Sequence, residues 1–284
     1  MSRVLDRRSF VQTVVAGVAA AAVPGLQVLA AEQAPLRATS LGERLAVIAG
    51  AGGNVTVLQG PEGPLLVDGG NAAASAGLLA LVALQAGSSA VFALFNTHWH
   101  PEQTGSNLAL GERGTRIIAH ENTRLWLGTD IDSTWQGRHF APLPHAALPG
   151  ETFYTTGKLK YGGEQIDYGH LMQAHTDGDI YVYLRSANVL VVGDLLAPGA
   201  YPVSDPDTNG WINGMVAANK SLLDLANATT RIVPGQGPVQ SRADLQRQYD
   251  MLIVVRDRLF DLIKQGLSAD EMLAARPTRE FDEH

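Results

Sequence analysis

The chain has 284 residues, with 21 Lys and Arg against 28 Asp and Glu, so its formal net charge is −7. Hydrophobic residues make up 45% and charged residues 17%, which is typical of globular proteins and excludes disordered and collagen-like chains. The acidic balance argues against a nucleic-acid partner, because binding to phosphates requires a basic surface. The chain has no cysteine, so any metal must be bound by histidines and carboxylates.

Residues 1–30 are predicted to be an export signal. A basic start containing Arg7-Arg8-Ser9-Phe10 precedes the apolar stretch Val11 to Val23, and this order is typical of a signal peptide. The four-residue motif resembles the twin-arginine export signal. A membrane-spanning helix needs about 20 apolar residues, so we expect cleavage near Ala30 and no stable membrane anchor. The mature protein is then periplasmic or secreted.

A linker is expected over residues 31–42, followed by one domain over 43–284. The domain begins with short apolar strands separated by Gly-rich turns, and helices then alternate with strands. Strands are predicted at 45–48, 55–58, 64–67, 90–95, 115–119, 153–161, 164–172, 180–184, 189–192 and 231–233. Helices are predicted at 72–85, from 121, and at 211–226, 241–265 and 267–275. The alternation indicates the α/β class.

A long loop is predicted between residues 128 and 150. Loops longer than about 12–15 residues are commonly functional or disordered. This loop and its flanks contain Trp126, Trp135 and Phe140. These aromatic residues indicate that the loop forms a wall that covers a substrate pocket. A second loop, Ala197 to Trp211, carries acidic residues, so we expect an apolar pocket with an acidic rim.

Candidate metal ligands follow several of the predicted strands. His98 and His100 stand two residues apart after the strand 90–95, and extended backbone places both side chains on one side. His175 lies at another strand end, and Asp194 closes the strand 189–192. Imidazole and carboxylate groups that converge from strand ends predict a zinc site.

Five motifs in order resemble the metallo-β-lactamase fold superfamily over about residues 43–265. They are Leu65-Leu-Val-Asp68-Gly-Gly, His98-Trp-His-Pro-Glu-Gln103, Ala174-His-Thr-Asp-Gly-Asp179, Val191-Val-Gly-Asp194 and Val233-Pro-Gly-Gln-Gly-Pro238. The resemblance implies an αββα four-layer sandwich, with a metal site along one edge between the two sheets.

The resemblance also implies which residues bind metal. The family's first metal site falls on His98, His100 and His175, and is intact. Its second site falls on Glu102, Gln103, Asp194 and Gln236, where three of the four ligands differ from the family pattern. Glutamine is a poor zinc ligand and suits a hard cation such as Mg²⁺ or Mn²⁺. We therefore expect one tightly held zinc ion.

The resulting prediction is an exported zinc-dependent hydrolase of a small molecule. Hydroxide on the zinc would attack a lactam, ester or thioester carbonyl, with Asp194 orienting the water and Glu102 accepting its proton. Alternatively, Glu102 accepts a hydrogen bond from a metal-bound histidine and steadies its ring. The alternatives are a mononuclear iron enzyme resembling persulfide dioxygenases, with iron on His98, His175 and Asp194, and a non-catalytic metal-binding paralogue.

The sequence also predicts roles for residues outside the four candidate ligands. His120, at a strand-to-helix junction, is expected to be structural, as a polar cap of the helix or through a hydrogen bond in the core. Asp68 either braces a metal-bound histidine or caps the following Gly-Gly turn. The loops contain no basic cluster, which favours a neutral or cationic substrate over an anionic one, and Arg138 is the exception. The sequence does not indicate an oligomeric state.

Overall fold

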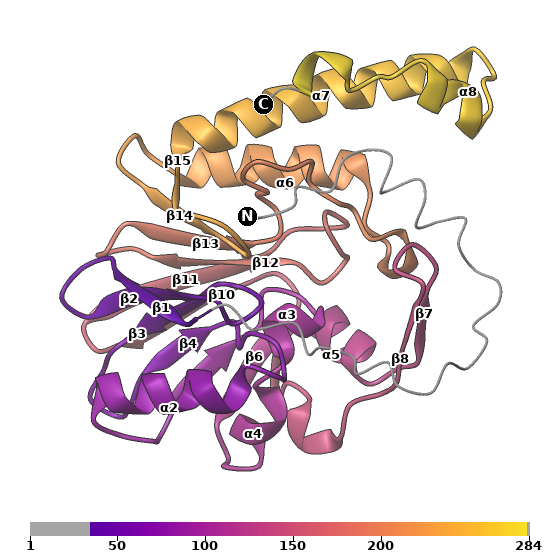
Figure 1. The fold of residues 1–284 in the computed structure, drawn as a ribbon. Helices are drawn as coiled ribbons and strands as arrows, with labels where there is room; N and C mark the ends of the chain where they lie inside the picture. The colour runs from indigo at the N-terminus through magenta and orange to yellow at the C-terminus, as the bar shows by residue number, and fades with distance from the viewer. Residues whose placement is uncertain (1–34, 283–284) are drawn as a thin grey trace. The chain divides into compact units, whose positions relative to one another are not determined.

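Two β-sheets form the centre of the computed structural model, which describes residues 35–282 (Figure 1). The predicted signal peptide lies outside the described residues. The first sheet has the strand order β1-β2-β3-β4-β5-β6-β9, with parallel pairing from β4 through β9. Its strands are β1 (Arg37–Ser40), β2 (Leu45–Ala49), β3 (Val55–Leu58), β4 (Leu65–Val67), β5 (Ala93–Phe95), β6 (Arg116–His120) and β9 (Glu151–Phe153).

The second sheet has the order β10-β11-β12-β13-β14-β15. Only the β13–β14 pair in this sheet is parallel. Its strands are β10 (Thr156–Tyr161), β11 (Glu164–His170), β12 (Ile180–Leu184), β13 (Val189–Gly193), β14 (Arg231–Pro234) and β15 (Gln240–Ser241).

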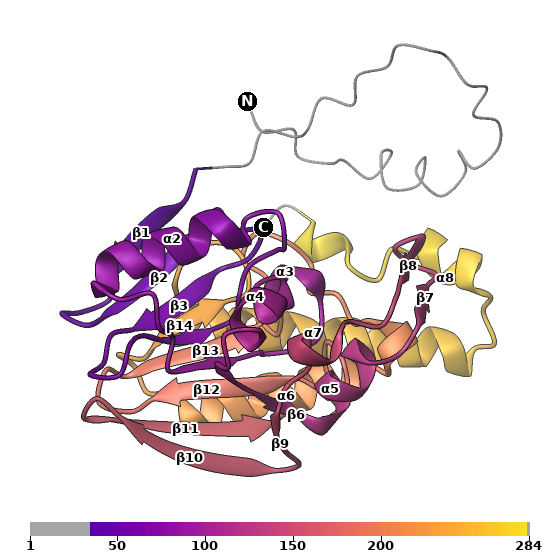
Figure 2. The ribbon, with the colours of Figure 1, turned by 90° about the horizontal axis from the view of Figure 1, so that it is seen from below.

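The apolar faces of the two sheets pack against each other. Phe95 and Val67 of the first sheet belong to one buried cluster with Ile166, Val182 and Val191 of the second. Burial of such side chains contributes about 1.5–3 kcal/mol each. Figure 2 shows the two sheets as adjacent layers. The strands therefore alternate between residues that face this core and residues that face the helices.

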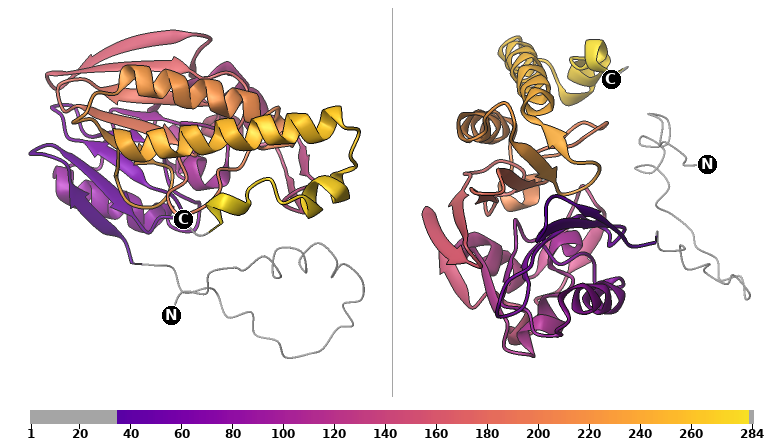
Figure 3. Two further views of the ribbon diagram at one scale, coloured as in Figure 1. Left: turned by 90° about the horizontal axis from the view of Figure 1, so that it is seen from above. Right: turned by 90° about the vertical axis from the view of Figure 1, so that its left-hand side faces the viewer.

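Helices cover the outer face of each sheet. Helix α2 (Ser75–Ala86) buries Leu78 and Val82 on the first sheet. Helices α6 (Ile212–Leu225) and α7 (Arg242–Lys264) cover the second, as Figure 3 shows. These layers form the expected αββα sandwich. The remaining helices are α3 (Pro101–Thr104), α4 (Asn107–Gly111), α5 (Glu121–Leu127), α8 (Ala269–Ala274) and three short 3₁₀ turns. Across residues 35–282, no helix is long and apolar enough to cross a membrane.

The structure differs from the predicted elements at the start of the domain, in the strand 153–161 and in the long loop, and it adds the short elements α3, α4 and β15. The sheet begins before the expected domain start at residue 43, because Arg37–Ser40 pairs with β2. The predicted strand 153–161 is two strands, since β9 pairs with β6 whereas β10 pairs with β11 in the other sheet. Strand periodicity continues across the junction, so the sequence carries no signal for the change of sheet.

The long loop 128–150 is also partly regular. It contains a small hairpin of β7 (Ile131–Ser133) and β8 (Arg138–Phe140), separate from both central sheets. Three-residue strands are too short to give a clear alternating pattern. The hairpin has its own apolar contacts, because Ile131 and Phe140 pack with Trp99 and Leu127.

Candidate metal centre

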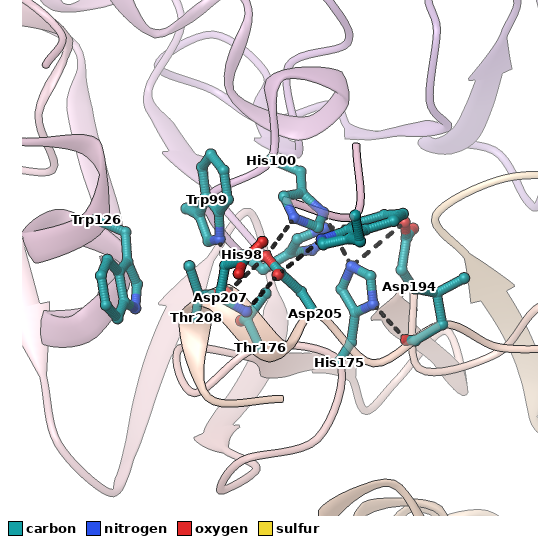
Figure 4. Close-up of polar contacts among 12 residues, drawn as sticks. His98, Trp99, His100, Trp126, His175, Thr176, Asp194, Asp205, Asp207 and Thr208 are labelled. Atoms are coloured by element: carbon teal, nitrogen blue, oxygen red, sulfur yellow. Dashed lines mark hydrogen bonds and ion pairs between the residues drawn. The ribbon is translucent and has the colours of Figure 1, made fainter. Parts of the chain in front are cut away.

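Four side chains meet at one edge of the sandwich. His98 and His100 lie between β5 and α3, His175 lies between β11 and β12, and Asp194 directly follows β13. One ligand atom from each lies within 4.8 Å of the others, and all three histidines are buried (Figure 4). The structure therefore brings together the four residues that the sequence selected as metal ligands.

In His100 and His175, the ring nitrogen that points away from the other histidines forms a hydrogen bond with a neighbour. We call it the outer nitrogen, and the other ring nitrogen the inner one. His100 Nε2 lies 3.1 Å from Asp205 Oδ2, and His175 Nδ1 lies 2.7 Å from the Val203 carbonyl oxygen. Because both partners only accept, these nitrogens carry the hydrogens, and the partners assign the tautomers. The inner nitrogens, His100 Nδ1 and His175 Nε2, then present lone pairs to each other across 2.9 Å. Two facing lone pairs repel unless a cation lies between them.

His98 has the same arrangement. Its Nδ1 lies 3.1 Å from Thr97 Oγ1, and that hydroxyl in turn donates to Asp68 Oδ2 over 2.9 Å. With Asp68 as the acceptor, the Thr97 hydroxyl accepts from His98 Nδ1–H, and this assignment leaves the lone pair on His98 Nε2. This Nε2 is buried and has no hydrogen-bond partner in the described residues. Asp68 thus braces a candidate ligand through Thr97, one of the two predicted roles.

The electrostatics favour neutral imidazoles in the site. Burial, together with the neighbouring His175 and His100, lowers the pKa of His98 well below its usual value. Burial also lowers the pKa of His100, despite the hydrogen bond to Asp205. A metal ligand must be unprotonated, so these shifts leave the inner nitrogens available for a cation at neutral pH. The three-histidine donor set fits zinc.

Asp194 closes the site on its more open side. Its Oδ2 lies 3.9 Å from His98 Nε2 and 3.8 Å from His175 Nε2. Its Oδ1 accepts a long hydrogen bond of 3.4 Å from Gln103 Nε2. A Cβ atom at Gly235 would clash with this carboxylate, so a side chain there would displace Asp194.

The positions of the altered second metal site are arranged differently. Gln103 is buried, and its Oε1 has no hydrogen-bond partner in the described residues. Gln236 is exposed in the turn after β14. Glu102 lies in the first turn of α3 and does not belong to the group of four converging ligand atoms. Of these three residues, Gln103 contacts Asp194, and its side chain is a neutral amide.

Asp205 is the main site residue that the sequence interpretation missed. It was expected on an acidic rim, but it is fully buried. Burial alone would raise its pKa, but hydrogen bonds from His100, Thr208 and Trp135 lower that pKa to about 2. Asp205 precedes a proline and caps a 3₁₀ turn, so its sequence context gives only a turn signal.

Two other histidines stand apart from the centre. His120 caps α5, as predicted, by accepting a hydrogen bond from the Asn122 backbone N–H. Its ring stacks on His170 with a centroid distance of 3.7 Å. His170 also contacts the Asp177 carbonyl oxygen at 2.9 Å. Neither belongs to the four-residue group.

Comparisons with known proteins agree with the fold. The metallo-β-lactamase superfamily model matches residues 49–255. A metallo-β-lactamase from Pontibacter korlensis superposes with a TM-score of 0.63 at 19% identity, over 77% of this chain and 99% of that one. The DIM-1 metallo-β-lactamase gives 0.62 at 15% identity, over 78% and 98%.

A double mutant of the sec-alkyl sulfatase PisA1 gives a TM-score of 0.65 at 15% identity, over 84% of this chain and 45% of that one. No curated protein matches the chain significantly. At these identities the solved structures establish the fold alone. The family match covers most of the chain and contains all four converging side chains. The chain therefore belongs to the metallo-β-lactamase superfamily, whose members are mainly metal-dependent hydrolases.

Proposed function

We propose that this protein is a zinc-dependent hydrolase that holds one metal ion on His98, His100 and His175, with Asp194 beside it. One observation carries the proposal. The three imidazoles have their outer nitrogens held by hydrogen bonds, so three lone pairs point to one buried place. One of them, on His98 Nε2, has no hydrogen-bond partner in the described part of the chain. This arrangement is stable only with a bound cation or with added protons.

The metal and the protein have separate tasks. Zinc held by the three histidines would supply Lewis acidity and would lower the pKa of a bound water to about 7. Asp194 has its Oδ2 next to two inner nitrogens, so it can orient the attacking water and accept its proton. This geometry favours Asp194 over Glu102 for that role. Gln103 donates to the other Asp194 oxygen and so steadies the carboxylate.

The surroundings favour a neutral carbonyl substrate, such as a lactam, an ester or a thioester. Among residues 35–282, no Lys or Arg forms a hydrogen bond or an ion pair with the four converging side chains. Arg138, the predicted exception, places its guanidinium 4.9 Å from the Phe140 ring centroid. Beyond the metal itself, an anionic substrate would therefore find no Lys or Arg partner at the four converging side chains.

Elemental analysis of protein purified without added metal tests the proposal. We expect about one zinc per chain, removable by a chelator, and hydrolysis of neutral esters, lactams or thioesters that returns with zinc. Asp194→Asn should keep the metal and lose turnover. Two metals per chain would show that Glu102, Gln103 and Gln236 form a second site.

The same measurement separates the alternatives. Iron together with oxygen consumption would favour the dioxygenase, because His98, His175 and Asp194 also form a two-histidine, one-carboxylate set. A metal-loaded protein that hydrolyses none of these carbonyl compounds would instead be a binding protein. Either result would contradict the hydrolase proposal.

We also propose that the protein is exported by the twin-arginine route. Support comes from Arg7-Arg8 and the following apolar stretch. Cell fractionation of the wild type and of a variant with both arginines changed to lysine tests this proposal. We expect the wild type outside the cytoplasm and the variant retained within it. An unchanged distribution would contradict export by this route.

A further inference from the structure

The β7–β8 hairpin is anchored at its base by apolar contacts. Ile131 is buried in a small cluster with Trp99 and Leu127, and Phe140 packs on Trp99 with a ring-centroid distance of 5.1 Å. Trp99 itself stands between the candidate ligands His98 and His100. The base of the hairpin is therefore fixed against the segment that carries two metal ligands.

The tip of the hairpin is held by polar contacts. The Thr134 backbone N–H and Oγ1 donate to Asp207 over 2.8 and 3.0 Å. The Trp135 indole Nε1 donates to Asp205 Oδ1 over 2.9 Å, while the other oxygen of Asp205 faces His100. One buried carboxylate thus holds both a metal ligand and the tryptophan at the tip.

The position of Trp135 leaves much of its ring uncovered. The residue remains 44% exposed, although its N–H is fully engaged, and its ring centroid lies 6.4 Å from that of His100. A tryptophan with a fixed polar end and an open apolar face is well suited to contact another molecule. Fixing the indole in advance also lowers the entropy lost when a ligand packs on it.

From these contacts we infer that Trp135 is a specificity-determining residue that binds the apolar acyl part of the substrate beside the reacting carbonyl. The inference rests on the proposed hydrolase function for the identity of that carbonyl. It adds the substrate class, which is carbonyl compounds with an alkyl or aryl acyl group. The hydrogen bond to Asp205 sets the angle of the indole, and the exposed face supplies the contact area.

Binding of alkyl hydroxamic acids to the zinc-loaded protein tests this inference without any turnover. The hydroxamate group chelates zinc, so the alkyl chain extends from the metal over its surroundings. Calorimetry would compare the acetyl, butanoyl, hexanoyl and octanoyl members. Complete burial of a methylene strengthens binding about fourfold, so for chains that pack on one side of an indole we expect about twofold per methylene in the wild type.

Variants show whether Trp135 contacts the alkyl chain or only supports the structure of the metal site. In Trp135→Ala, binding should hardly depend on chain length, while acetohydroxamate binding stays within about threefold of wild type. Trp135→Phe keeps a ring without the N–H, and should retain part of the dependence; it also serves if the alanine variant does not fold. Tyr154→Ala removes a 70% exposed aromatic ring outside the four-residue group, and should keep the full dependence.

Three results would overturn the inference: no chain-length dependence in the wild type, an unchanged dependence in Trp135→Ala, or an equal loss for all members of the series. The third result would indicate that Trp135 only supports the metal site. A Trp135-dependent series in a protein that hydrolyses no carbonyl compound would contradict the proposed function and leave the binding role of Trp135 intact.

Discussion

The two sides of the metal centre differ in how firmly their side chains are held. On one side, His98, His100 and His175 each have an outer nitrogen fixed by a neighbour, and all three are buried. On the other side, Gln103 offers only a neutral amide, whose N–H donates to Asp194, and Gln236 is exposed. A cation binds tightly where folding has already oriented the ligand atoms and removed them from water. The comparison therefore indicates one pre-organised metal site, on the side of the three histidines.

The largest expected effect comes from removing an inner nitrogen. His175→Ala should weaken zinc binding at least 100-fold, because it removes one of the three imidazoles that folding has already oriented toward the ion. Competition with a chromogenic chelator measures the affinity. His145→Ala, which removes an exposed histidine from a 3₁₀ turn, provides the control and should bind zinc normally. Equal zinc affinity in both variants would contradict the assigned ligand set.

The second-largest effect is expected at Asp194, which we compare with Glu102. We expect Asp194→Asn to lower kcat at least 100-fold, the usual contribution of a general base, and Glu102→Gln to lower it less than tenfold. Both variants should keep about one zinc per chain. The reverse order of the two losses would return the general-base role to Glu102, as the sequence alone suggested.

A smaller effect on zinc affinity is expected at Asp205, which contacts the candidate ligand His100. Asp205→Asn should weaken zinc binding about tenfold, because outer partners of ligating histidines typically contribute 10–100-fold to metal affinity. Asp207→Asn is the matched control, since Asp207 holds Thr134 of the hairpin and contacts no candidate ligand. If both variants bind zinc like the wild type, the Asp205–His100 contact does not support the metal site.

The smallest effect concerns the stacked histidines outside the centre. Burial and the neighbouring His170 lower the pKa of His120 to about 4, and burial also lowers the pKa of His170. Below about pH 6.5 the unfolded chain then binds more protons than the folded one, so stability falls as the pH drops toward 4.

Urea unfolding of the zinc-loaded protein at pH 7 and pH 5 measures this loss. We expect His120→Asn, which keeps a capping side chain, to reduce the loss between the two pH values by about 1 kcal/mol. An identical loss in wild type and variant would show that His120 does not contribute to the pH dependence of stability.

Much of the architecture could be predicted from the sequence. Apolar periodicity placed the central strands and the helices α2, α6 and α7 to within a few residues, because each element buries one face in a continuous core. The motifs that follow β5, β11 and β13 selected the four converging side chains. These features are local, so the order of residues along the chain carries them.

Only the tertiary structure decided how the site is held. Asp205 reaches His100 across 105 positions of sequence, and the Val203 carbonyl orients His175 from 28 positions away. A buried carboxylate and a surface carboxylate look alike in a sequence, since burial depends on which loops meet in space. The change of sheet between β9 and β10, and the position of Trp135, depend on the same long-range packing. The sequence by itself identified the candidate ligands, whereas folding determined their tautomers, their burial and the position of Trp135 beside them.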